Sequence, residues 1–143
     1  MAFNKYPKIT TTYIEDELYE SVNGNGNKTL IDMRGPEQKQ SLAPMEVLLG
    51  AVASCSAVDL VEILKKRKKT FSSLTVTTEG ERRDDHPRAF TKIKLQFSLI
   101  SDNITHEELY KNAKLVVDKY CSVATTVSGV AELEVEVEVV GGE

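Results

Sequence analysis

A long uncharged stretch in the first half of the chain places the tightest limit on its fold. No residue from Val47 to Val58 carries a charge, and Pro44 and Glu46 stand just before this stretch. Proline suits the first position of a helix and an acidic residue suits its first turn, so we expect a helix that begins at Pro44. At about 1.5 Å per residue, roughly 18 Å of this helix is apolar on every side. Such a helix must be buried all round, either by sheets or with the help of a second subunit.

Short strand-like runs and one further helix surround this segment. Three strands are expected before it, in the runs 9–13, 18–22 and 29–33, with a turn cluster at 23–27. A hairpin follows, with strands near 74–78 and 93–99 and a polar turn at 82–88, and the alternating run 132–139 predicts a final strand. Thr105 and Glu108 form a capping-box pattern in front of a helix that ends near Tyr120. We therefore expect one α+β domain over residues 1–143, in the order βββ, α, ββ, α, β, with room for a short helix before the last strand.

Composition narrows the functional classes. The 143 residues carry a formal net charge of −4, whereas general nucleic-acid binding needs a basic face, so we expect no nucleic-acid partner. The basic run 65–69 lies at the expected end of the apolar helix, where cations complement the helix dipole, with an anion-binding patch as the alternative. No stretch approaches the roughly 20 apolar residues that span a bilayer, and the N-terminus lacks the apolar core of a signal peptide. We expect a cytoplasmic protein with no membrane segment.

Two cysteines offer the clearest chemistry. Cys55 lies within the apolar helix and Cys121 follows the second helix, too far apart in sequence for a CxxC redox or zinc motif. A structural disulfide is not expected in a reducing cytoplasm. A two-cysteine peroxidase needs one thiolate that attacks an O–O bond to give a sulfenic acid, and a second thiol that condenses with it. From spacing alone, two buried core cysteines are the plainer alternative.

Position along the helices predicts which of the two thiols is more acidic. Cys121 would open a short helix that runs to Val127 and would gain from its dipole, whereas Cys55 lies in the middle of a helix, so this criterion favours Cys121 as the more acidic thiol. Metal binding has little support, because His86 and His106 lie in a polar turn and in a first helical turn, where a solvated histidine is ordinary. We expect no metal and no organic cofactor.

The segments around both cysteines resemble the OsmC/Ohr family of organic hydroperoxide reductases. The resemblance rests on residues 41–55, 59–66 and 119–124, and residues 81–97 are similar to the YhfA-like branch of that family. It implies an OsmC-like α+β fold in which antiparallel sheets wrap two central helices, built as an intertwined homodimer with active sites at the subunit interface. It also implies that Cys55 is the attacking cysteine and Cys121 the resolving one, which reverses the assignment from helix position.

One position departs from the family pattern. The resemblance calls for an acidic residue directly after the helix-opening proline, paired with an N-terminal arginine beside the attacking thiol, but Met45 stands there. The neighbouring Glu46 points about 100° further round the helix, where it is either a substitute for the missing carboxylate or a favourable charge in a first turn. Four arginines are candidates for stabilising the thiolate, with solvated turn residues as the alternative. They are Arg34, Arg82, Arg83 and Arg88.

These observations predict a thiol-dependent hydroperoxide reductase with catalytic Cys55, Cys121 and Glu46. An organic hydroperoxide would oxidise Cys55 to a sulfenic acid, and Cys121 would resolve it as a disulfide. Turnover would need an external dithiol, for which the resemblance suggests a lipoyl protein. The alternative function is a redox-sensing or small-ligand-binding OsmC-like protein with little peroxidase turnover, which Met45 favours. In a third interpretation, both thiols are core residues that do not react with peroxide.

Overall fold

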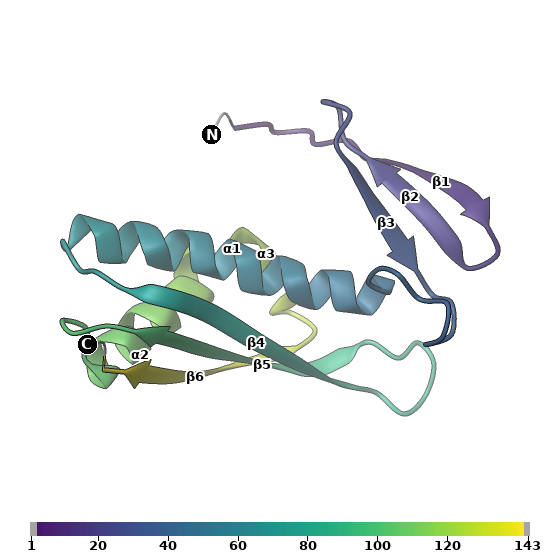
Figure 1. Ribbon diagram of the computed structural model, residues 1–143. Coiled ribbons are helices and arrows are strands. Elements are labelled where there is room, and N and C mark those ends of the chain that lie inside the picture. Colours follow the sequence, from purple (N-terminus) through teal and green to yellow (C-terminus); the bar gives the residue numbers. More distant parts are fainter. Residues whose placement is uncertain (1–2, 142–143) are drawn as a thin grey trace. The chain divides into compact units, whose positions relative to one another are not determined.

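The computed structural model describes residues 3–141 and has α+β composition, with two three-stranded sheets and several helices (Figure 1). Its elements follow the predicted order, including the short helix before the last strand. The chain divides into two compact units, one that ends at Leu48 and one that begins at Leu49. That the whole chain forms one domain stays a prediction.

The first unit contains an antiparallel meander of three strands, as predicted. Its strands are β1 (Thr10–Glu15), β2 (Leu18–Val22) and β3 (Lys28–Asp32), in the order β1-β2-β3. Asn23 organises the turn between β2 and β3, because its side-chain oxygen accepts hydrogen bonds from the backbone N–H groups of Asn25 and Asn27 at 3.0 and 2.9 Å. Gly26 adopts a φ of 86° in this turn, a conformation that favours glycine.

The sheet of the second unit is mixed, which corrects the expectation that the sheets are antiparallel. It contains β4 (Ser72–Arg82), β5 (Phe90–Ile100) and β6 (Glu132–Val140) in the order β4-β5-β6. The predicted hairpin pairs β4 with β5 in antiparallel fashion, but β6 runs parallel to β5, with Leu95 opposite Val135. The physical reason is the long helical connection between β5 and β6, which returns the chain to the end of the sheet where β5 began.

Within the part of the chain that the structure describes, four helical segments complete the fold. They are α1 (Pro44–Lys66), α2 (His106–Leu115), the π-helix η1 (Val116–Tyr120) and α3 (Ser122–Val127). The start of α1 at Pro44 and the cap of α2 are confirmed, since the Thr105 side chain accepts a hydrogen bond from the backbone N–H of Glu108 at 3.1 Å. The π-turn was not predicted, because apolar spacing does not reveal one extra residue in a helical turn.

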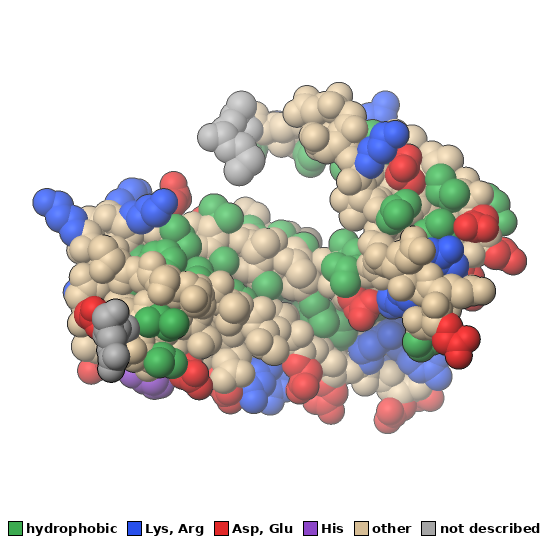
Figure 2. All heavy atoms as spheres, in the orientation of Figure 1, with side chains coloured by type: hydrophobic (Ala, Val, Ile, Leu, Met, Phe, Trp, Pro, Cys, Tyr) green, Lys and Arg blue, Asp and Glu red, His purple; other side chains and the backbone are tan. Residues whose placement is uncertain are grey.

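Only one stripe of α1 is buried within the second unit, so the sheet of this unit does not bury the helix all round, and burial with the help of a second subunit stays a prediction. Its buried residues recur every fourth position, as Val52, Ser56, Leu60 and Leu64. Val58, by contrast, is 56% exposed. Figure 2 shows hydrophobic side chains at the surface over this part of the second unit. The apolar composition of α1 is therefore not explained by contacts within the second unit alone.

The expectation that no segment could span a bilayer also needs correction. By length and composition, α1 is long and apolar enough to cross a membrane. A single helix of this kind does not indicate a membrane protein, because the core helix of a soluble protein passes the same test. The basic residues Lys65 and Lys66 lie in its last turn, as the sequence predicted, where they complement the helix dipole.

Candidate functional site

The fold of the second unit places Cys121 beside the part of α1 that carries Cys55. Cys121 Sγ lies 4.0 Å from the carbonyl oxygen of Val52, one turn before Cys55 and Ser56. The side chains of both Cys55 and Ser56 are close enough to influence the ionisation of Cys121. Both cysteines are free thiols. Two residues that are far apart in the sequence thus form a pair.

Cys121 occupies the N-cap position of α3 and is fully buried. Its sulfur accepts a hydrogen bond from the backbone N–H of Ala124 at 3.3 Å. Burial nevertheless raises the pKa of the Cys121 thiol, and it outweighs the Ser56 side chain and the Ala124 N–H group, which both lower that pKa. Helix position therefore does not make Cys121 acidic: α3 begins where predicted, but desolvation dominates.

The π-helix η1 determines where Cys121 lies. The backbone N–H of Cys121 donates to the carbonyl of Val116 at 2.8 Å, a bond that spans five residues and closes the π-turn. Val116 and Val117 are both buried, which anchors this turn in the core of the second unit. π-turns inside helices are frequent at functional sites, and here one directly precedes a candidate catalytic residue.

Cys55 differs from Cys121 in its exposure. It lies on α1 beside the buried stripe and is partly exposed, whereas Cys121 is fully buried. An attacking thiol must meet substrate, whereas a resolving thiol need only meet its partner, and which role each cysteine has stays a prediction.

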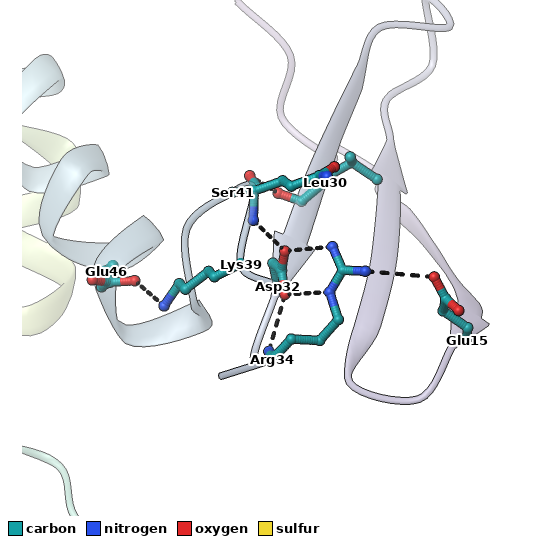
Figure 3. A network of polar contacts seen from close by, with 8 residues as sticks. Glu15, Leu30, Asp32, Arg34, Lys39, Ser41 and Glu46 are labelled. Carbon is teal, nitrogen blue, oxygen red and sulfur yellow. Dashed lines mark hydrogen bonds and ion pairs between the residues drawn. The ribbon is translucent and has the colours of Figure 1, made fainter. Parts of the chain in front are cut away.

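Glu46 is engaged at the start of α1. Its carboxylate accepts a hydrogen bond from Lys39 Nζ at 2.7 Å (Figure 3). It also accepts one from the backbone N–H of Ala43 at 2.8 Å. Lys39 and the Ala43 N–H group lower the pKa of the Glu46 carboxyl. These contacts confirm the interpretation of Glu46 as a favourable charge in a first turn, where it closes one half of a capping box. A further role beside the thiols stays a prediction.

Arg34 is bound to a buried carboxylate. Its Nε and Nη2 atoms donate to the two oxygens of Asp32 at 3.0 and 2.9 Å, and its Nη1 lies 3.5 Å from Glu15 (Figure 3). Asp32 also accepts from the backbone N–H groups of Arg34 and Gln40 at 3.0 and 2.8 Å. The Arg34 guanidinium holds the pKa of the Asp32 carboxyl well below its usual range. Within the first unit, Arg34 fastens the segment after β3 and is already neutralised.

The other candidate arginines lie in the exposed turn between β4 and β5. Arg82 Nε donates to the carbonyl of Arg88 at 2.8 Å, and Arg88 Nη1 lies 2.6 Å from His86 Nε2. Arg83 is exposed as well. Among the residues that the structure describes, no arginine contributes to the pKa shift of Cys121. These arginines and His86 therefore organise a turn. Within residues 3–141, no three His, Cys, Asp or Glu side chains are grouped to hold a metal ion.

Ser56 is the site residue that sequence reasoning missed. It is fully buried, and among the described residues its hydroxyl has no hydrogen-bond partner. The clue in the sequence was its position: Ser56 falls on the same helical face as Val52, Leu60 and Leu64, where a hydroxyl needs a reason to be buried.

Comparison with known proteins identifies the family and the fold of this chain. The sequence profile of OsmC-like proteins matches residues 36–138. Protein YhfA of Escherichia coli strain K12 is 30% identical over 128 residues, which cover 90% of this chain and 94% of YhfA. The crystal structure of an OsmC-like protein from Mycoplasma pneumoniae has a TM-score of 0.83 at 21% identity, over 96% of this chain and 99% of that one.

More distant structures share the fold. The organic hydroperoxide resistance protein OhrB of Bacillus subtilis has a TM-score of 0.64 at 13% identity, over 92% of this chain and 97% of OhrB. At this identity the likeness establishes the fold alone. The predicted resemblance is confirmed: this chain belongs to the OsmC-like protein family.

Proposed function

We propose that this protein is a thiol-dependent hydroperoxide reductase with Cys55 as the attacking residue and Cys121 as the resolving one. The observation that carries the proposal is that the buried thiol of Cys121 lies against the turn of α1 that leads to the partly exposed thiol of Cys55. The name of the Bacillus subtilis relative supports the substrate class, an organic hydroperoxide. We further propose a cytoplasmic location, where free thiols persist between turnovers.

The chemistry divides into three balanced steps. The Cys55 thiolate attacks the O–O bond of the hydroperoxide, which gives a Cys55 sulfenic acid and an alkoxide that takes up a proton and leaves as the alcohol. The Cys121 thiolate then attacks the Cys55 sulfur, and hydroxide leaves and is protonated to water as the disulfide forms. An external dithiol, for which a lipoyl group is our candidate, reduces this disulfide and is itself oxidised to a disulfide.

A homodimer would complete the site. The exposed apolar face of α1, with Val58 at 56% exposure, is the kind of surface that a second copy of the chain would cover. Within residues 3–141 of one chain, no arginine contributes to the ionisation of Cys121, and Arg34 is bound to Asp32. We propose that two copies intertwine and that the dimer supplies the cation beside Cys55 that a single chain does not offer.

Intact mass spectrometry tests the proposal directly. Reduced protein is treated with one equivalent of cumene hydroperoxide, alongside Cys55→Ser and Cys121→Ser variants. We expect the wild type to lose two hydrogens, Cys121→Ser to form a sulfenic acid that dimedone traps, and Cys55→Ser to stay reduced. If the wild type keeps both thiols after prolonged exposure, the proposal is wrong and the cysteines are core residues.

A redox sensor or small-ligand-binding protein is the second candidate, because Met45 stands where the resemblance calls for an acidic residue. The two functions differ in turnover. With dihydrolipoamide as the reductant, an enzyme consumes many equivalents of cumene hydroperoxide per chain. A sensor forms its disulfide once and is reduced too slowly to sustain consumption.

A further inference from the structure

Ser56 has an unusual hydrogen-bonding situation. A serine inside a helix commonly donates to the carbonyl four residues earlier, and Ser54 does so to Gly50 at 2.8 Å. For Ser56 that carbonyl belongs to Val52, yet the Ser56 hydroxyl has no partner among the described residues. The Val52 carbonyl instead lies 4.0 Å from Cys121 Sγ. The unpaired Ser56 hydroxyl and the buried Cys121 thiol therefore lie at the same turn of α1, the first as part of the helix and the second packed against it.

We propose that the Ser56 hydroxyl donates a hydrogen bond to the Cys121 thiolate while that thiolate attacks the Cys55 sulfenic acid. This inference rests on the proposed peroxidase function and adds a residue to its resolving step. Ser56 transfers no proton in the step. Its hydroxyl hydrogen stabilises the sulfur anion, and hydroxide still leaves from Cys55.

The surroundings of Cys121 explain why a second donor is needed. In the neutral thiol, the S–H group faces the Val52 carbonyl and the sulfur accepts from the Ala124 N–H at 3.3 Å. Once the thiol ionises, the Val52 carbonyl becomes a repulsive neighbour and the Ala124 N–H is the remaining donor. A fully buried anion with one donor is costly. The Ser56 hydroxyl lies one turn beyond the Val52 carbonyl that Cys121 contacts, is near enough to lower the pKa of Cys121, and has no partner among the described residues, so it can turn toward the anion.

The ionisation of Cys121 supports this geometry. Ser56 lowers the pKa of the Cys121 thiol, while burial and the neighbouring Cys55 thiol raise it. Cys55 on α1 is the titratable group that acts on Cys121. The charged residues nearest in sequence, Asp59 on α1 and Asp118 and Lys119 on η1, make no contribution, and α3 carries no charged residue. Ser56 thus provides part of the thiolate stabilisation that charged groups provide in other thiol sites.

Ser56→Ala and its matched control Ser54→Ala test the inference through the pH profile of disulfide formation. In rapid-quench experiments with excess cumene hydroperoxide, we expect Ser56→Ala to move the midpoint of the rate profile up by about one pH unit. The fraction of thiolate near pH 7 falls about tenfold, but a more basic thiolate is about threefold more nucleophilic, so the net loss in rate is about threefold. Above both midpoints, Ser56→Ala should be the faster protein.

This crossover separates a chemical role from a structural one. Ser54→Ala, which removes an exposed hydroxyl with its own partner, should reproduce the wild-type profile. Ser56→Ala should also melt no lower than the wild type, because it removes an unpaired buried hydroxyl. An unshifted midpoint in Ser56→Ala overturns the inference, and so does a uniform loss of rate at every pH.

A second measurement keeps this inference distinct from the proposed function. In Cys55→Ser, Cys121 is the one thiol left, and the 13Cβ shift of labelled cysteine reports its titration by NMR. We expect the added Ser56→Ala substitution to raise the Cys121 pKa by about one unit. If the wild type fails to oxidise but this shift is seen, the peroxidase proposal falls while the contact stands. If the titration does not move, the contact itself is disproved.

Discussion

The ring of Phe90 lies directly against Gly80 on the neighbouring strand, in the space that a side chain at position 80 would need. Phe90 is 6% exposed, so its ring is held in place by the core. Gly80→Ala should therefore lower the stability of the second unit by about 1–3 kcal/mol, even though alanine normally suits a strand better than glycine.

Urea unfolding followed by circular dichroism measures this effect. Gly129→Ala is the control, because nothing lies within 4 Å of the Cβ that it would add. Equal stability of the two variants would show that the Phe90 ring moves aside without cost.

The Asp32–Arg34 pair should stabilise the first unit in a pH-dependent manner. The pKa of Asp32 is lowered in the folded state, so the pair stabilises the fold above the ordinary aspartate pKa of about 4, and this stabilisation is lost as the pH falls below that value. Asp32→Asn should lower the melting temperature by several degrees at pH 7, because Arg34 loses its buried partner.

The difference between wild type and Asp32→Asn should shrink as the pH is lowered toward 3. Glu20→Gln is the control: its 4.0 Å pair with Lys28 lies on the surface of the same sheet, and its loss should have little effect. A difference that does not depend on pH would mean that packing, not charge, explains the cost.

Glu46 should act mainly as a cap of α1. Glu46→Ala leaves the Ala43 N–H without its acceptor and should lower the melting temperature, whereas Glu46→Gln keeps an acceptor oxygen and should lower it less. Stopped-flow oxidation of Cys55 by cumene hydroperoxide should be unchanged in Glu46→Gln. A tenfold slower reaction at unchanged stability would instead assign Glu46 to the catalytic site.

The buried Cys121 thiol should make the fold sensitive to alkali. Its pKa is raised in the folded state, so the unfolded thiol ionises first and stability is lost as the pH rises above the ordinary thiol pKa of about 8.5. Cys121→Ser keeps a cap for α3 but does not ionise in this range, so it should lose less stability between pH 7 and 10. Melting curves of the two proteins give this comparison directly, and parallel losses would refute it.

The exposed apolar face of α1 should be a dimer interface. Sedimentation should show the wild type at twice the 15.9 kDa mass of one chain, and Val58→Lys should shift it toward the monomer because it places a charge in that face. Val130→Lys makes the same change at a residue that is 72% exposed, and it should leave the dimer intact. A wild type that sediments as a monomer would contradict the proposed assembly.

The sequence predicted the elements of this fold well, because each one carries a strong local pattern. Pro44 and Thr105 mark helix starts that the structure confirms, and the alternating apolar residues of β5 are buried as expected. The parallel pairing of β6 was missed, since alternation shows which face of a strand is buried but not which way the strand runs.

The candidate site was less accessible to sequence reasoning. The family resemblance paired Cys55 with Cys121, but the balance between helix position and burial at Cys121 depends on packing that no local pattern records. Ser56 was overlooked for the same reason. Its importance comes from a missing partner, and a missing partner is a property of the folded core.

The π-turn before Cys121 sets the direction in which the Cys121 side chain leaves the helix. In an α-helix each residue turns the chain by about 100°. If η1 lacked the one extra residue of its π-turn, Cys121 would therefore rotate by about that angle around the helix axis. Loss of one residue from η1 would preserve both cysteines, yet it would turn the Cys121 sulfur away from Val52. In this chain, the proximity of Cys121 to α1 thus depends on the rotational phase of the helix before it, and a variant could keep both cysteines yet separate them.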